Sequence, residues 1–335
     1  MVMIMAPGGT KEMALGVLDA GADATYVGVQ GWSRRGNQDE LSDEDIREVI
    51  DYALARDKNV RIVVNTQPSS IEIPMFLERV KMYHAWGAKG FMISDIGCMK
   101  LVNEQIPTAE IHTSVGCGIT NYADVHFLSE LGARYVVLPY RLSVAEIEQI
   151  KRENNVGIEV FLFKTPAGGK ICPGKCMMSS YFSFERWLDE QGKDHFFGSA
   201  SRGGDCLRVC QTMWDLETAE EQIEKEITIK ENPSLWLTEL PAYLHAGVEC
   251  LKVPGRDRSA GLVMDLTSCY RRAVDEILSC EAPNLPRLNL HKYELELQAL
   301  RVRWQQERGK RDDRLIDSAL AASSRSLIST DRLRV

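Results

Sequence analysis

The sequence lacks any apolar run near the roughly 18 residues that a membrane-spanning helix needs, so we expect no transmembrane segment. Its first residues, 1–9, also lack the basic stretch that opens a secretory signal. Positive charge is in deficit, since 40 Lys and Arg face 48 Asp and Glu and leave a net charge of −8. Such a chain repels nucleic-acid phosphates. We therefore expect a cytoplasmic protein, and the charge balance disfavours nucleic acid as its partner.

Apolar material is plentiful. Hydrophobic residues make up 44% of the 335 residues and charged residues 26%, which is typical of a soluble globular protein. There is enough apolar side-chain material for a core, which excludes disorder of the whole chain. The length allows either two domains or one large barrel with additions.

A helix-to-strand joint recurs four times. In each copy an amphipathic helix ends, a Gly-Ala or Gly-Val pair follows, and a short β-rich apolar run begins. The copies centre on Gly21, Gly87, Gly132 and Gly247. A Gly at this place suits a left-handed helix C-cap. The repetition predicts a series of α/β units.

Eight strands are predicted, with helical patterns between most of them. They are 2–6, 24–28, 60–65, 90–94, 110–113, 135–138, 157–163 and 250–253. Ser42 and Ser143 are predicted helix N-caps. Eight alternating units favour a closed parallel (β/α)8 barrel, similar to a TIM barrel. An open doubly wound sheet is the alternative, but no Gly-x-Gly-x-x-Gly links a strand to a helix.

The predicted units are uneven. Residues 1–280 form the predicted barrel domain, and within it residues 164–232 make a long insertion after the seventh strand. A loop of that length in a compact domain indicates function. Residues 281–335 form a predicted helical, partly disordered tail that is rich in Arg. This tail presents either a solvated helix face or a contact for a partner or a membrane surface.

Four cysteines lie in the insertion as two Cys-x3-Cys pairs. They are Cys172 with Cys176 and Cys206 with Cys210. Disulfides are not expected in a reducing compartment, whereas four thiolates suit tetrahedral zinc or an iron–sulfur cluster. Zinc ribbons more often use Cys-x2-Cys, so the spacing favours iron–sulfur and leaves zinc as the alternative.

Polar side chains stand at the predicted carboxyl ends of the strands, where barrel enzymes place their active sites. They are Asn65, Asp95, His112, Arg141, Lys252 and Arg256. Two further predictions concern the strands themselves. Glu159 and Lys252 are charged residues inside strand-like runs, so they face the barrel interior or neutralise each other. His112 is either a general acid or base or a hydrogen-bonded structural residue.

Several motifs together resemble the collagenase-like peptidases of family U32. They are Glu159-Val-Phe-Leu-Phe, Gly174-Lys-Cys176-Met-Met-Ser179-Ser180-Tyr181, Gly21-Ala-Asp-Ala-Thr-Tyr-Val-Gly28, His112-Thr-Ser and Leu251-Lys-Val-Pro-Gly-Arg256. The resemblance covers about residues 1–280. It implies a barrel-like α/β domain that carries a cysteine-bound [4Fe–4S] cluster.

The resemblance is greatest to the UbiU/UbiV-type proteins, which perform oxygen-independent hydroxylation in ubiquinone biosynthesis and work as a pair. It implies an aromatic small-molecule substrate, a prephenate-like oxygen donor and a heterodimer with a related family member. Other branches hydroxylate a pyrimidine in RNA. A peptidase, as the family name suggests, and a non-catalytic cluster-bearing subunit are further alternatives. The motifs offer no Ser-His-Asp or Cys-His arrangement and no His-Glu-x-x-His.

Site residues follow from the resemblance position by position. Cys176 matches the family's Gly-x-Cys, Cys206 and Cys210 match its downstream pair, and Cys172 stands in for a cysteine that usually lies further upstream. Arg141, Lys252 and Arg256 are predicted to hold the carboxylates of the donor. The predicted catalytic residues, for orientation and proton transfer, are Asn65, Asp95, His112 and Glu159. Gly116 and Gln211 depart from common family residues, which leaves the acceptor open.

Overall fold

A computed structural model describes twelve parts of the chain. They are residues 2–34, 39–139, 142–164, 178–181, 185–197, 202, 210, 213–217, 219, 222–228, 234–280 and 290–307. The predicted site residues Arg141, Cys172, Cys176 and Cys206 lie outside these parts.

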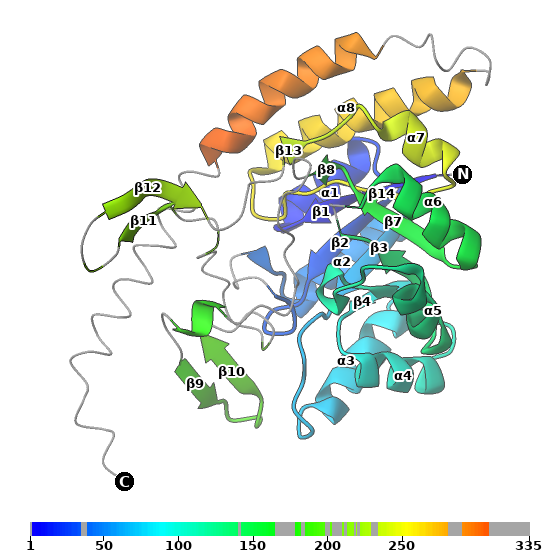
Figure 1. Cartoon of the computed structure of the whole chain (residues 1–335). Helices are drawn as coiled ribbons and strands as arrows, with labels where there is room; N and C mark the ends of the chain where they lie inside the picture. Colours follow the sequence, from blue (N-terminus) through cyan, green and yellow to red (C-terminus); the bar gives the residue numbers. More distant parts are fainter. Residues whose placement is uncertain are drawn as a thin grey trace.

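Eight parallel strands close into a barrel in the order β1-β14-β7-β6-β5-β4-β3-β2 (Figure 1). Their bounds are β1 (Met3–Gly8), β2 (Ala24–Gly28), β3 (Asn59–Val63), β4 (Gly90–Ile93), β5 (Glu110–Thr113), β6 (Ala133–Val137), β7 (Gly157–Phe161) and β14 (Cys250–Lys252). Each predicted strand overlaps one of these. The predicted (β/α)8 barrel is therefore confirmed, and the open doubly wound sheet is excluded.

Helices follow the strands around the outside of the barrel (Figure 1). They are α1 (Lys11–Asp19), α2 (Asp43–Leu54), α3 (Ile73–Ala85), α4 (Ile96–Gln105), α5 (Tyr122–Glu130), α6 (Val144–Glu153), α7 (Leu240–His245) and α8 (Ala260–Ser279). The Ser42 side chain accepts the Asp45 amide at the start of α2. Ser143 and Glu146 form a capping box at the start of α6. Both predicted N-caps are confirmed.

The four predicted joints share one backbone device. Gly21, Gly87, Gly132 and Gly247 all have positive φ, at 104°, 107°, 100° and 79°. A side chain is strained in this region, so glycine ends each helix and turns the chain into the next strand. The prediction of left-handed C-caps is confirmed at all four positions.

Alternating side chains separate two environments on each strand. Outward residues such as Ile4, Ile62 and Phe91 are fully buried and belong to the large apolar layer between strands and helices. The inward face carries a small apolar group that includes Met5, Tyr26 and Met92, together with charged residues. The barrel axis therefore differs in chemistry from the surrounding layer.

The end of the described chain is a helix over residues 291–307, which lies along α8 (Figure 1). Leu297 is fully buried in the same apolar core as the barrel helices. The Tyr293 hydroxyl donates to the Glu276 carboxylate on α8 at 2.7 Å, and Arg303 pairs with Asp265 at 2.6 Å. These two contacts fasten this helix to α8. No helix in the described ranges has the length and hydropathy required to cross a membrane.

The insertion begins and ends at one place. Strand β8 (Phe163–Lys164) follows β7 and pairs antiparallel with β13 (Ser234–Leu235). The residues between them therefore leave and re-enter at the carboxyl end of β7. The described pieces of the insertion include a short 3-10 helix, η3 (Met178–Tyr181), and two hairpins, β9 (Glu185–Leu188) with β10 (Asp194–Phe197) and β11 (Met213–Glu217) with β12 (Gln222–Thr228).

Candidate functional site

Three predicted site residues meet inside the barrel. Glu159 on β7 receives a hydrogen bond from Lys252 Nζ on β14 at 2.6 Å. Its other carboxylate oxygen lies 3.2 Å from His112 Nδ1 on β5. Glu159 and His112 are fully buried, and Lys252 is 4% exposed. Both interpretations of the Glu159–Lys252 pair hold, because the two residues face the interior and also neutralise each other.

Burial would raise the pKa of Glu159, because a carboxylate loses its hydration in the core. The nearby Lys252 charge and the hydrogen bond from His112 outweigh this effect and lower the pKa to about 2. Glu159 is therefore a carboxylate at neutral pH. A carboxylate can only accept hydrogen bonds, so Nδ1 of His112 carries the proton in this pair.

The orientation of the His112 ring is fixed by packing. It stacks on Tyr135 with 4.5 Å between ring centroids and 5° between planes. A methyl group at Gly90 would lie only 3.0 Å from His112 Nε2, so the absent side chain there makes room for the ring. Within the described residues, Nε2 has no hydrogen-bond partner, and Glu110 lies 3.9 Å from it.

Two inward charges were missed from the sequence. Arg61 on β3 is 2% exposed and pairs with Glu110 on β5 at 3.0 Å. Strand alternation could have revealed Arg61, because Val60 and Ile62 on either side are apolar and face the helices. On β5 the same alternation places Glu110 on the inward face, because it lies two residues before the inward-facing His112.

Asn65 lies at the mouth formed by the carboxyl ends of the strands. Its side-chain oxygen accepts the Arg34 amide at 3.1 Å, and its nitrogen donates to Ser114 Oγ at 3.1 Å. Ser114 also accepts the Gly116 amide at 3.2 Å. A methyl group at Gly116 would come within 2.7 Å of Ser94 Oγ. Asn65 therefore ties the loop after β2 to the loop after β5.

Asp95 and Arg256 each hydrogen-bond to another group of the protein. The Asp95 carboxylate accepts the Cys98 amide at 2.9 Å and caps α4. Arg256 is 7% exposed and donates to Ser33 Oγ at 2.7 Å. Ser33 in turn donates to Glu40. Asp95 thus starts a helix, and Arg256 holds the segment after β2.

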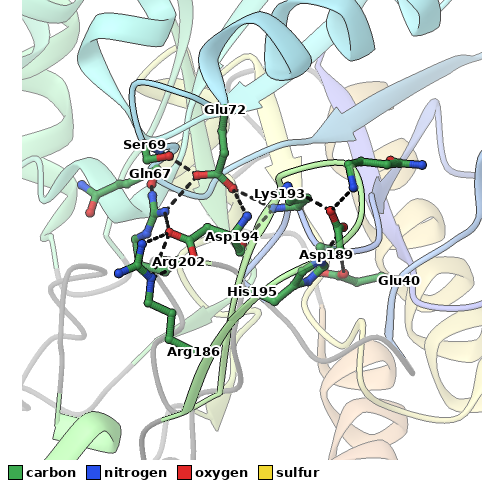
Figure 2. Close-up of polar contacts among 12 residues, drawn as sticks. Glu40, Gln67, Ser69, Glu72, Arg186, Asp189, Lys193, Asp194, His195 and Arg202 are labelled. Carbon is green, nitrogen blue, oxygen red and sulfur yellow. Dashed lines mark hydrogen bonds and ion pairs between the residues drawn. The ribbon is translucent and has the colours of Figure 1, made fainter.

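A second ionic cluster, centred on Glu72, fastens the insertion to the barrel (Figure 2). The buried Glu72 carboxylate receives hydrogen bonds from Lys193 Nζ at 3.1 Å and the Asp194 amide at 3.2 Å. Arg202 Nη2 adds a third at 2.9 Å, and the Ser69 amide a fourth at 2.7 Å. Burial would raise the pKa of Glu72, but these donors lower it to about 2. The cluster was not predicted, because Glu72 lies more than a hundred residues before Lys193, Asp194 and Arg202 in the sequence.

The positions of these contacts show where the insertion lies. It is rooted at the carboxyl end of β7, while its β9–β10 hairpin contacts Glu72, which follows β3. The Lys193 ammonium also lies over the ring of Trp32, 4.2 Å from the ring centroid. Trp32 belongs to the loop after β2. In the barrel order, β7 and β3 are diametrically opposed. The described parts of the insertion therefore lie at two opposite walls of the mouth.

The structure describes only part of the predicted metal-ligand set. Cys210 is described, and the other three cysteines are not. In the ranges that are described, no group of three His, Cys, Asp or Glu could hold a metal ion. Cys250, inside the barrel, has a pKa well above its usual value because of burial, so it is a thiol.

Comparison with known proteins gives a consistent family. The model of peptidase family U32 matches residues 9–308. An uncharacterised protease of Methanocaldococcus jannaschii is 27% identical, over 88% of this chain and 70% of that protein. The tRNA hydroxylation protein P of Escherichia coli is 26% identical, over 82% of this chain and 68% of that protein.

A third relative is much longer than the matched region. The 23S rRNA 5-hydroxycytidine synthase of Escherichia coli is 25% identical, over 82% of this chain and only 39% of that protein. Two of the three names denote hydroxylation of RNA. They do not support our expectation, drawn from net charge, that nucleic acid is disfavoured.

Proposed function

Because this chain belongs to peptidase family U32, we propose that it is an oxygen-independent hydroxylase that adds a hydroxyl group to an aromatic ring at the barrel mouth. The names of the RNA-hydroxylating relatives favour a pyrimidine base of RNA as the acceptor. A small aromatic ring, as in ubiquinone biosynthesis, is the second candidate. The net charge of −8 favours it, because such a ring has no phosphates to repel.

The observation that carries this proposal is the course of the insertion. Its described parts are rooted at β7 and fastened to the loops after β2 and β3, at the end of the barrel where enzymes of this architecture place their chemistry. The four cysteines belong to this same segment. A cofactor held by them would therefore be carried by the segment whose described parts are fastened at the mouth.

Cys172, Cys176, Cys206 and Cys210 are the proposed ligands of a [4Fe–4S] cluster, with zinc as the alternative metal. Four thiolates are the donor set that such clusters use. When bound, an iron–sulfur cluster supplies electron transfer that no side chain can provide. Arg202, four residues before Cys206, is fixed to Glu72, so the Glu72 cluster would help to position the cysteine segment over the barrel.

The protein's own residues would orient reactants and handle protons. Arg141 is the proposed contact for a carboxylate of a prephenate-like donor. Lys252 and Arg256 already bond to Glu159 and Ser33, so we assign them to positioning. The pair of His112 and Glu159 offers a proton donor and acceptor below the mouth.

Peptide hydrolysis is supported less well. A protease of the serine or cysteine type needs a nucleophile paired with a base. Across the described residues, the ion-pair partners of His112 are the carboxylates of Glu159 and Glu110. Neither of these is a serine or cysteine nucleophile.

To test the proposal, the protein is purified without oxygen and incubated with prephenate. The acceptor is either RNA from a strain that lacks this protein or a prenylated phenol. Mass spectrometry should find one added oxygen atom on a pyrimidine of the RNA. One added oxygen atom on the phenol instead would support the second candidate acceptor. The Cys176→Ser variant should abolish this product. The matched control is Cys280→Ser at the end of α8, which should retain it. Release of peptides from a protein substrate, with no oxygen gained on either ring, would overturn the proposal.

A further inference from the structure

Five ionisable side chains form a continuous series through the barrel interior. Arg61 Nη2 lies 3.0 Å from Glu110 Oε2, and that oxygen lies 3.9 Å from His112 Nε2. His112 Nδ1 lies 3.2 Å from Glu159, whose other oxygen is 2.6 Å from Lys252 Nζ. All five come from inward positions on β3, β5, β7 and β14. We call this series the axial chain.

Filling a barrel interior with ionisable side chains is energetically unfavourable. Barrel interiors are ordinarily packed with branched apolar side chains, and removing charges from water costs several kcal/mol for each ion. The axial chain limits this cost by balance, since two cations, Arg61 and Lys252, face two anions, Glu110 and Glu159. Two glycines also make room for it. A methyl group at Gly90 would collide with the Arg61 side chain, and one at Gly157 would collide with the Tyr135 ring beside His112.

The two ends of the axial chain open in different directions. The Glu110 side chain is 37% exposed and lines a cavity of about 1040 Å³ at the amino ends of β5, β6 and β7. Lys252 is the last residue of β14, at the opposite end of the barrel. There its ammonium lies over the Tyr26 ring, 4.4 Å from the centroid. The axial chain thus runs from a solvent-facing cavity to the floor of the mouth.

Several polar atoms in the axial chain are buried without hydrogen-bond partners in the described structure. They are Nε and Nη1 of Arg61 and Nε2 of His112, whereas Oε2 of Glu110 faces Arg61 Nη2 at 3.0 Å. Nε2 of His112 faces Glu110 across 3.9 Å, which is the longest step of the axial chain.

We propose that the axial chain is a proton relay between the cavity at the amino ends of the strands and Lys252 beneath the mouth. A proton from cavity water enters on the Glu110 carboxylate and passes to His112 Nε2. His112 then gives its Nδ1 proton to Glu159. Glu159 passes a proton to Lys252, which has released its own proton toward the mouth. One proton enters, one leaves, and every group returns to its starting charge, while the proton of His112 has moved from Nδ1 to Nε2.

The 3.9 Å step between Glu110 and His112 is longer than a hydrogen bond. Transfer across it requires Glu110 to swing closer or a single water to bridge. Glu110 can move because its side chain borders the cavity and is held by one ion pair, to Arg61. This residue therefore acts as the gate of the relay. The inference goes beyond the proposed hydroxylation and does not depend on it.

The test follows the ring N–H protons of His112 by NMR in full-length protein labelled with nitrogen-15 at histidine. After transfer to D2O, relay through Glu110 predicts that these protons exchange much faster than the backbone amides of β5. Glu110→Gln cannot pass a proton and should slow the exchange at least about tenfold. Glu130→Gln is the matched control, because Glu130 lines the same cavity and pairs with exposed His126 instead.

Each outcome decides the question. Fast exchange in the wild type and in Glu130→Gln, with slow exchange in Glu110→Gln, supports the relay. Exchange in the wild type that is as slow as in the β5 amides overturns it, and so does exchange that Glu110→Gln leaves unchanged. If Glu110→Gln fails to fold, Glu110→Asp replaces it in the same comparison with Glu130→Gln, because its shorter side chain holds the carboxylate further from His112.

Discussion

The two faces of the barrel strands obey different physics. On β3, Ile62 points outward and is fully buried among apolar side chains, while its neighbour Arg61 points inward and is 2% exposed beside Glu110. The outer layer gains stability from every apolar group it removes from water. The inner series is stable only while its charges stay paired. Burial alone therefore does not reveal what a residue contributes, and the face of the strand must be known as well.

The largest expected effect comes from breaking a pair on the inner face. Lys252→Met leaves the Glu159 carboxylate buried with no ammonium at 2.6 Å. Removing one partner of a buried pair costs about 3–5 kcal/mol. Denaturant unfolding of the variant should show a loss of this size in the free energy of unfolding.

The control for this prediction removes both charges. Lys252→Met with Glu159→Gln should recover most of the lost free energy, because no charge is then left unpaired on that side of His112. A double variant as unstable as the single one would show that Lys252 stabilises the fold through packing rather than through charge.

An intermediate effect is expected at the Glu72 cluster, which pairs charges outside the barrel. Glu72→Gln leaves Lys193 and Arg202 without their carboxylate, which costs about 1–3 kcal/mol in the local contact. Hydrogen exchange should rise in residues 185–197, whereas Glu78→Gln on the exposed face of α3 should leave it unchanged. Equal exchange in both variants would mean that the hairpin is held by other contacts.

The same cluster predicts a dependence on pH. The pKa of Glu72 is lowered from 4.5 to about 2 by its donors, so its contribution is complete above pH 4.5 and is lost as the pH falls toward 2. After correction for the intrinsic pH dependence of amide exchange, the protection of residues 185–197 should fall over this window in the wild type. In Glu72→Gln the protection should already be low and should change little with pH.

The smallest effect is expected in the outer layer. Ile62→Val removes one methylene from a fully buried site and should cost about 0.5–1.5 kcal/mol. Because no charge is involved, this loss should be the same at pH 5 and pH 8, as judged by denaturant unfolding. A strong pH dependence would indicate that the change disturbs Arg61 on the other face of β3.

The contrast also explains what could be predicted from sequence. The barrel, its eight strands and the glycine C-caps follow from periodicity and local backbone preference, which short windows contain. The Glu159–Lys252 pair was predicted because charged residues within apolar strand runs must find partners. The cluster at Glu72 could not be predicted, because its contacts to Lys193 and Arg202 depend on how the insertion folds across the mouth.

Purification without oxygen, followed by assay of iron, sulfide and zinc, tests the central claim that the insertion carries an iron–sulfur cluster over the barrel mouth. We expect about four irons and four sulfides per chain, both lost in Cys176→Ala and Cys206→Ala. We also expect that Cys280→Ser retains them. Stoichiometric zinc with no iron, in a colourless protein, would contradict this claim.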